Sequence, residues 1–149
     1  MPGDLIAMSL VVQKFGGTSV ANLECMQKVK QKVLLALDEG HKVVVVLSAM
    51  SQVTNKLVKM ANEFSSNPDA AEKDSLLATG EQASTALFAM LLADSGVKCR
   101  SMLSHQIKIH TDSAYGKARI LEIDTENVDM LLKRYDVLVV AGFQGVDSS

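Results

Sequence analysis

The sequence has 149 residues, 48% of them hydrophobic, which is enough to bury one sizeable core, and its formal net charge is only −2. The weak charge and the low aromatic content of 4% argue against a nucleic-acid-binding surface and against attraction to anionic membranes. No apolar run reaches the length of a membrane span and residues 1–8 lack the regions of a signal peptide, so we expect a cytoplasmic protein whose Cys25 and Cys99 stay reduced.

The first half of the chain alternates between expected strands and helices. Residues 10–13 are expected to form a short strand. Residues 21–38 repeat apolar side chains at three- and four-residue steps, which predicts a helix. Residues 43–47 are an unbroken, β-branched apolar run, which is typical of a strand buried on both faces. Two further helices are expected at residues 53–64 and 72–94.

The second half continues the same alternation. Strands are expected at residues 97–103 and 137–141, an edge strand at 119–123 and a helix at 125–134, whereas residues 106–113 have no clear preference. Strands that alternate with helices predict a parallel sheet covered on both faces. We therefore expect an α/β fold, a three-layer αβα sandwich with a mainly parallel sheet.

The end of the first expected strand carries residues suited to holding an anion. The sequence there reads KFGGTS, from Lys14 to Ser19. Glycines let the backbone approach a ligand, helix-starting amides attract negative charge, and the lysine adds a full positive charge. The alternative is a tight turn in which Ser19 caps the next helix and Lys14 is solvated. The spacing alone fits both interpretations.

Two later strands also end in small or polar residues. The second strand is followed by SAMSQVTN, whose hydroxyls could contact a polar substrate, although Ser51 or Thr54 could instead cap the next helix. The last strand ends in AGFQG, a turn punctuated by glycines. No segment matches GxxxxGK[ST] or GxGxxG, which disfavours P-loop and conventional dinucleotide folds. Ligands bind beyond the carboxyl ends of parallel strands, so these segments are candidates for one site.

One acidic residue interrupts the apolar helix expected at residues 72–94. Helical spacing puts Glu81 on the same face as Leu77, Ser84 and Phe88. A buried carboxylate is costly unless it is paired or hydrogen-bonded. Glu81 could lie near the exposed beginning of the helix. We favour the interpretation that it faces a cavity and receives a substrate ammonium, with Gly80 leaving room for close approach. His41, His105 and His110 have no metal-ligand spacing, so no metal site is predicted.

Taken in order, the segments KFGGTSV, VLSAMSQVTN, TGEQASTALFAMLL and VVAGFQG resemble the aspartokinases of the amino-acid kinase family. The resemblance runs from about Leu10 to the last residues. It implies a carbamate kinase-like fold and ATP-dependent phosphorylation of L-aspartate to 4-phospho-L-aspartate, a step toward lysine, threonine, methionine and isoleucine. The alternatives are another amino-acid kinase, acting on glutamate, acetylglutamate or UMP, and a non-catalytic interaction module.

The resemblance also implies a role for each matching residue. Lys14 would be the catalytic lysine that contacts the transferring phosphoryl group, and Thr54 and Glu81 would bind the substrate aspartate. ATP would arrive with Mg²⁺, and the aspartate carboxylate would need no general base, because positioning and charge neutralisation supply most of phosphoryl-transfer catalysis. The nucleotide phosphates would be held by Lys14, Gly16, Gly17, Thr18, Ser19 and Ser48.

The family pattern is longer than this sequence. It continues with a second glycine-rich segment, a nucleotide-binding half and regulatory ACT domains, none of which the sequence contains. We therefore expect residues 1–9 to be a flexible extension and residues 10–149 to be the N-terminal, substrate-side part of a kinase domain with negligible activity alone. An exposed sheet edge would favour a homo-oligomer.

Overall fold

A computed structural model describes residues 9–148. Its centre is a parallel sheet with the strand order β1-β2-β6-β3. These strands are β1 (Leu10–Phe15), β2 (Lys42–Leu47), β3 (Cys99–Met102) and β6 (Val137–Ala141). The extension expected at residues 1–9 lies outside the described residues except for Ser9, whose carbonyl oxygen accepts a hydrogen bond of 3.1 Å from the Lys42 amide.

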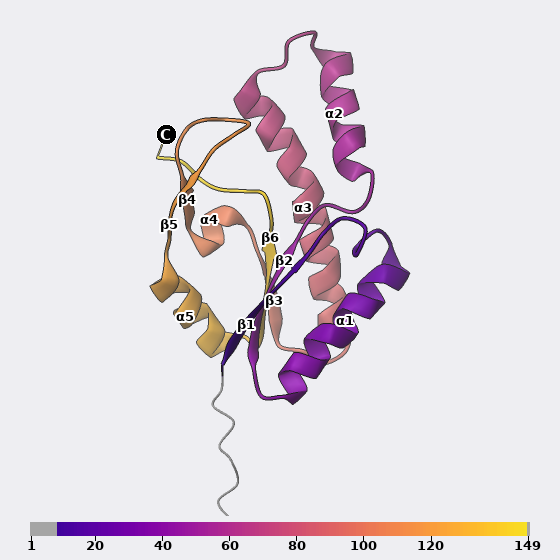
Figure 1. The fold of residues 1–149 in the computed structure, drawn as a ribbon, viewed down its shortest axis with the longest axis vertical. Coiled ribbons are helices and arrows are strands. Elements are labelled where there is room, and N and C mark those ends of the chain that lie inside the picture. The colour runs from indigo at the N-terminus through magenta and orange to yellow at the C-terminus, as the bar shows by residue number, and fades with distance from the viewer. Residues whose placement is uncertain (1–8, 149) are drawn as a thin grey trace, which may run out of the picture.

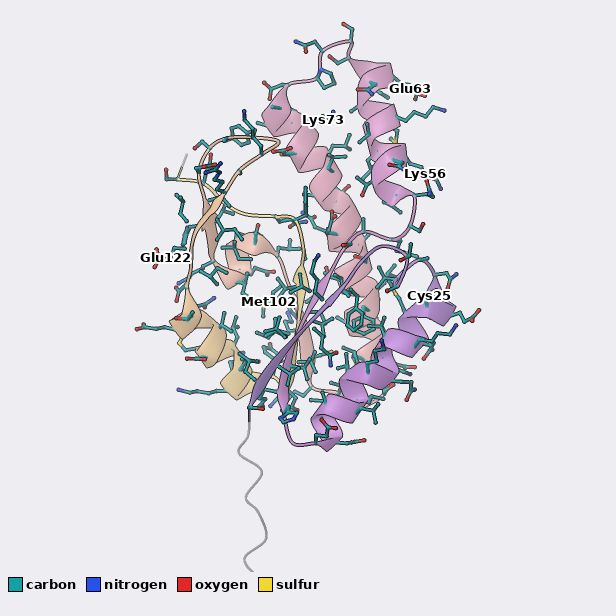
Figure 2. The ribbon with its side chains drawn as sticks, viewed as in Figure 1. Cys25, Lys56, Glu63, Lys73, Met102 and Glu122 are labelled. Carbon is teal, nitrogen blue, oxygen red and sulfur yellow. The ribbon has the colours of Figure 1, made fainter. Side chains whose placement is uncertain are left out.

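Helices cover both faces of this sheet, which confirms the expected three-layer arrangement (Figure 1). On one face lie α1 (Leu23–Asp38) and α3 (Ala70–Ala93), with α2 (Val53–Phe64) packed against α3. On the other lie the short α4 (Ser104–Ile107) and α5 (Thr125–Arg134). Figure 2 shows Met102 among the side chains at the centre of the molecule, whereas Lys56 and Glu63 on α2 are exposed.

Two hydrophobic clusters, one on each face, hold the layers together. Alternate residues of β2 enter each cluster, Val43, Val45 and Leu47 on the side of α1 and α3, and Val44 on the side of α4 and α5. β6 divides its side chains in the same way. Because successive residues of a strand point to opposite faces, a strand between two helical layers needs apolar residues throughout. This explains the unbroken runs of β2 and β6.

The ambiguous segment at residues 106–113 contains the second half of α4 and a short strand, β4 (Ile109–Thr111). β4 pairs antiparallel with β5 (Ile120–Ile123), the strand expected at 119–123. The two form a separate sheet outside the central one. The four-residue helix and three-residue strand are too short for a periodic pattern to reveal them.

α3 is the one helix of the described chain that is long and apolar enough to cross a membrane by length and composition. The sequence-based expectation counted only unbroken apolar runs and missed it. The core helix of a globular domain meets the same criterion, and α3 lies against the central sheet with Phe88 and Leu92 fully buried. Its place in the core therefore explains part of its apolar composition, although Leu87 and Met90 are exposed.

Candidate functional site

The three strand ends singled out in the sequence meet at one edge of the sheet. β1, β2 and β6 are neighbours and run in the same direction, so their carboxyl ends lie side by side. The Ser48 amide donates a hydrogen bond of 3.1 Å to the Phe15 carbonyl, and the Gly142 amide donates one of 2.8 Å to the Leu47 carbonyl. The loops that follow the strands are therefore fixed to one another.

A hollow of about 440 Å³ opens where these loops meet α2 and α3. The loop after β1 and the start of α2 provide hydroxyl and amide groups, and α3 contributes a single carboxylate. The hollow thus has mixed polar and apolar walls and carries one negative side chain among them. It is lined by Gly17, Thr18, Ser48, Ala49, Met50, Ser51, Gln52, Thr54, Asn55, Glu81 and Phe143.

Five of the eight predicted site residues line this hollow, and three do not. Those that line it are Gly17, Thr18, Ser48, Thr54 and Glu81. Gly16 and Ser19 belong to the same loop without lining the hollow. Lys14 is exposed at the end of β1, beside Val46 in register. Since Phe15 joins the cluster on the α1 side, strand alternation places Lys14 on the opposite face of the sheet from Glu81 and α3.

The loop after β1 is shaped by contact with the loop after β2. A Cβ atom on Gly17 would lie 2.9 Å from the Ala49 carbonyl oxygen, whereas one on Gly16 would meet nothing within 4 Å. α1 is capped by Asn22, whose side chain accepts a hydrogen bond of 2.9 Å from the Cys25 amide. Ser19 is therefore not the cap of this helix, and the alternative interpretation of the KFGGTS segment is wrong in that respect.

Of the described residues, Glu81 is the one charged residue that lines the hollow. Its side chain lies on the buried face of α3 and only 8% of the residue's surface is exposed. Its Oε1 accepts one long hydrogen bond, 3.4 Å, from the Ala49 amide. No lysine, arginine or histidine of residues 9–148 lies within ion-pair distance of it. Burial raises the pKa of Glu81, and hydrogen bonds from the backbone only partly oppose this. A cation supplied by a ligand would satisfy the carboxylate.

α3 also fixes the loop that faces Glu81. One turn after Glu81, the buried Ser84 hydroxyl donates a hydrogen bond of 2.7 Å to the Ser48 carbonyl. A Cβ atom on Gly80 would lie 3.0 Å from the Ala49 side chain and 3.2 Å from Val53. The space that Gly80 leaves is therefore taken by the protein's own loop and α2, not by a ligand as the sequence suggested.

The start of α2 forms another wall. Gln52 occupies the N-cap position with φ 66°, in the left-handed region, and its side chain makes no capping hydrogen bond. Neither Ser51 nor Thr54 has the capping role considered for it in the sequence. The hydroxyl of Thr54 therefore lies at the hollow without a capping role, whereas the Asn55 amide group donates a hydrogen bond of 3.0 Å to the Gln52 side chain.

Six lining residues were not among the predicted site residues, and all but Phe143 belong to the loop after β2 and the start of α2: Ala49, Met50, Ser51, Gln52, Asn55 and Phe143. Phe143 lies in the glycine-punctuated turn after β6, and its side chain is fully exposed. The next residue, Gln144, donates a hydrogen bond of 2.8 Å from Nε2 to the Ala78 carbonyl of α3. The sequence does show a large apolar residue between two glycines at a strand end. That pattern alone does not predict a site residue, because the hollow beside Phe143 is formed by segments distant in the sequence.

Comparison with known proteins extends this description. A model of the amino acid kinase family matches residues 9–149. An aspartate kinase of Stutzerimonas stutzeri is 49% identical over 140 residues, and an aspartokinase of Pseudomonas aeruginosa is 48% identical over 142. These matches cover 94% and 95% of this chain and 34% of each relative, so the chain spans about one third of their length.

Solved structures agree with the sequence matches. The crystal structure of aspartate kinase from Synechocystis has a TM-score of 0.74 at 37% identity, covering 94% of this chain and 22% of that one. The structure of E. coli aspartokinase III in complex with aspartate and ADP also has a TM-score of 0.74. At 24% identity, over 95% of this chain and 42% of the other, this second likeness concerns the fold alone.

Proposed function

The chain belongs to the amino acid kinase family, and on that premise we propose that it forms the amino-acid-binding part of an aspartate kinase. In this reaction a side-chain carboxylate oxygen of L-aspartate attacks the γ-phosphorus of ATP. The bond from that phosphorus to the bridging oxygen of ADP breaks, and 4-phospho-L-aspartate and ADP are formed. The names of the relatives support this choice of substrate, and we place the step in amino-acid biosynthesis in the cytoplasm.

The observation that carries the proposal is the buried carboxylate of Glu81. It faces a hollow with hydroxyl and amide groups in its walls and has no cationic partner among the described residues. An α-ammonium group would supply the missing positive charge. A charged hydrogen bond in a partly buried site is roughly twice as strong as a neutral one. The hydroxyls of Ser48 and Thr54 lie in the same walls and could accept or donate hydrogen bonds to the rest of the amino acid.

The phosphoryl group would lie toward the loop after β1. Gly16, Gly17 and Thr18 would offer backbone amides there, and Thr18 and Ser19 their hydroxyls, because the Ser19 amide is already bonded to the Gly16 carbonyl at 3.0 Å. Lys14 lies outside the hollow, on the sheet face opposite Glu81, so its positive charge would have to reach the phosphoryl group around the carboxyl end of β1. Because the carboxylate is already a nucleophile, its attack needs neutralised phosphate oxygens and good alignment but no base. Mg²⁺ would enter as part of the MgATP substrate.

Binding of amino acids to the chain tests this proposal directly. We expect L-aspartate to bind in calorimetric or NMR titrations and succinate, which lacks the amine, to bind at least about thirtyfold more weakly, which corresponds to ~2 kcal/mol. Glu81→Gln should weaken aspartate to the same extent. Glu63→Gln, which removes an exposed carboxylate on α2, is the matched control and should have no effect.

The same titration separates the alternatives. Tighter binding of L-glutamate would identify a different acid substrate, and tight binding of N-acetylglutamate, whose nitrogen is uncharged, would contradict the role of Glu81. Because Glu81 must be ionised to hold an ammonium group, aspartate affinity should fall as the pH is lowered through the raised pKa of Glu81. Aspartate-dependent formation of ADP by the 149-residue chain should be negligible, because it spans only one third of the relatives.

A further inference from the structure

The exposed ring of Phe143 is not explained by the fold. Phe143 stands at the rim of the hollow and is the most exposed large hydrophobic residue of the described chain. Leaving an aromatic ring in water forfeits the stabilisation that burying it would bring. The ring makes no contribution to either hydrophobic cluster.

The backbone at Phe143 carries a second cost. Its φ is 58°, in the left-handed region that bulky side chains rarely adopt. The turn is held in this shape from both sides. The Gly142 amide bonds the Leu47 carbonyl, a Cβ atom on Gly142 would lie 2.9 Å from that same oxygen, and Gln144 bonds the Ala78 carbonyl. The surrounding structure thus imposes the position of the ring.

The surroundings indicate what the ring can do. It shares the hollow with Glu81, the one carboxylate in its walls. An aromatic face attracts a cation, and a ring that covers an ion pair also removes the water that weakens it. An ammonium group held by Glu81 would meet both conditions.

We propose that Phe143 is a specificity-determining residue whose ring covers the amine end of an amino-acid ligand bound at Glu81. This inference rests on the proposed function and adds a recognition element to it. The ring would select ligands with a free ammonium group over acids of the same shape without one. It would act on binding, because it carries no group that can transfer a proton or contact phosphate oxygens productively.

Two substitutions separate the ring from the backbone. Phe143→Asn removes the ring and keeps a residue that tolerates the left-handed conformation, and Phe143→Tyr keeps the ring. Both should fold, because the side chain is fully exposed, and thermal unfolding will verify this. In titrations of the 149-residue chain with L-aspartate, we expect Phe143→Asn to weaken binding about tenfold and Phe143→Tyr to bind within about twofold of the parent.

The outcomes distinguish this inference from the function on which it rests. If the parent binds aspartate and Phe143→Asn binds equally well, the inference is wrong and the proposed function stands. Equal losses in Phe143→Asn and Phe143→Tyr would also overturn it, as would a Phe143→Asn variant that changes only self-association in sedimentation experiments. If the parent binds neither aspartate nor another amino acid, both proposals fail.

Discussion

At the scale of single residues, the protein places one carboxylate where the fold gives it little support. Glu81 lies among Gly80, Ser84 and Phe88 on the buried face of α3 and receives one long hydrogen bond. Natural proteins tolerate such groups mainly at functional sites, where burial shifts a pKa for a task. The cost of burying the Glu81 charge can be measured through the dependence of the free energy of unfolding on pH.

We predict that Glu81→Gln raises the free energy of unfolding at pH 7, because it replaces a buried charge that has no cationic partner among the described residues by a neutral group of the same shape. The pKa of Glu81 is raised in the folded state, so the unfolded chain ionises first as the pH rises. The parent therefore loses stability between the ordinary pKa of 4.5 and the raised one, and the variant does not.

Urea unfolding of both proteins from pH 4 to pH 8 would check this. The two curves should converge below the ordinary pKa and separate above it. The control, Glu63→Gln, should stay within about 0.5 kcal/mol of the parent, because its ion pair with Lys59 is exposed to solvent. A variant that is less stable than the parent at pH 7 would mean that the Glu81 carboxylate is stabilising, contrary to the prediction.

At the scale of elements, the site depends on how closely the loops after β1, β2 and β6 approach one another. Gly17 and Gly142 lie against the carbonyl oxygens of Ala49 and Leu47, and α3 holds the middle loop through the Ser84 hydroxyl. Interiors are packed too densely to accept an added methyl group at such contacts. Two adjacent glycines allow a direct comparison.

Gly17→Ala should lower the free energy of unfolding by about 1–3 kcal/mol, because its Cβ atom would overlap the Ala49 carbonyl oxygen. Gly16→Ala should leave the stability unchanged or raise it by up to about 1 kcal/mol, because the added atom meets open space and restricts the unfolded chain. Chemical denaturation measures both. Equal effects of the two substitutions would show that the loops do not approach as closely as described.

The elements differ in how far the sequence predicts them. β2, β6, α2 and α5 follow their patterns closely. Burial on both faces of a strand leaves an unbroken apolar run, and burial of one helical face leaves a periodic one. The buried face containing Glu81 was predicted for the same reason. The side of the sheet on which Lys14 lies depends on strand register, and the position of Phe143 depends on hydrogen bonds between distant segments. Neither leaves a local pattern.

At the scale of the whole molecule, the first strand leaves part of the sheet uncovered. β1 is at the edge of the central sheet as described, and Leu10 and Val12 are exposed on the face that also carries Lys14. Edge strands with apolar residues readily pair with another chain. This feature underlies the proposal that the chain forms homo-oligomers.

We predict that Val12→Lys reduces self-association, measured by sedimentation velocity over a range of concentrations, because a charge on an edge strand opposes pairing. Val12 is 63% exposed, so the stability should change by less than about 0.5 kcal/mol. Leu35→Lys, which adds the same charge at an equally exposed position on α1, is the control and should leave the association unchanged. A parent that stays monomeric at millimolar concentration would refute the proposal.

The contacts of Gly17 and Gly142 with carbonyl oxygens have a genetic consequence. Every amino acid that a single-nucleotide change can put in place of glycine carries a Cβ atom, so neither codon has a harmless missense neighbour. The codon for Gly16, whose surroundings are open, does not share this restriction. In a saturation library selected for folded protein, we expect every substitution at positions 17 and 142 to be depleted. Substitutions at position 16 should be retained at a higher frequency.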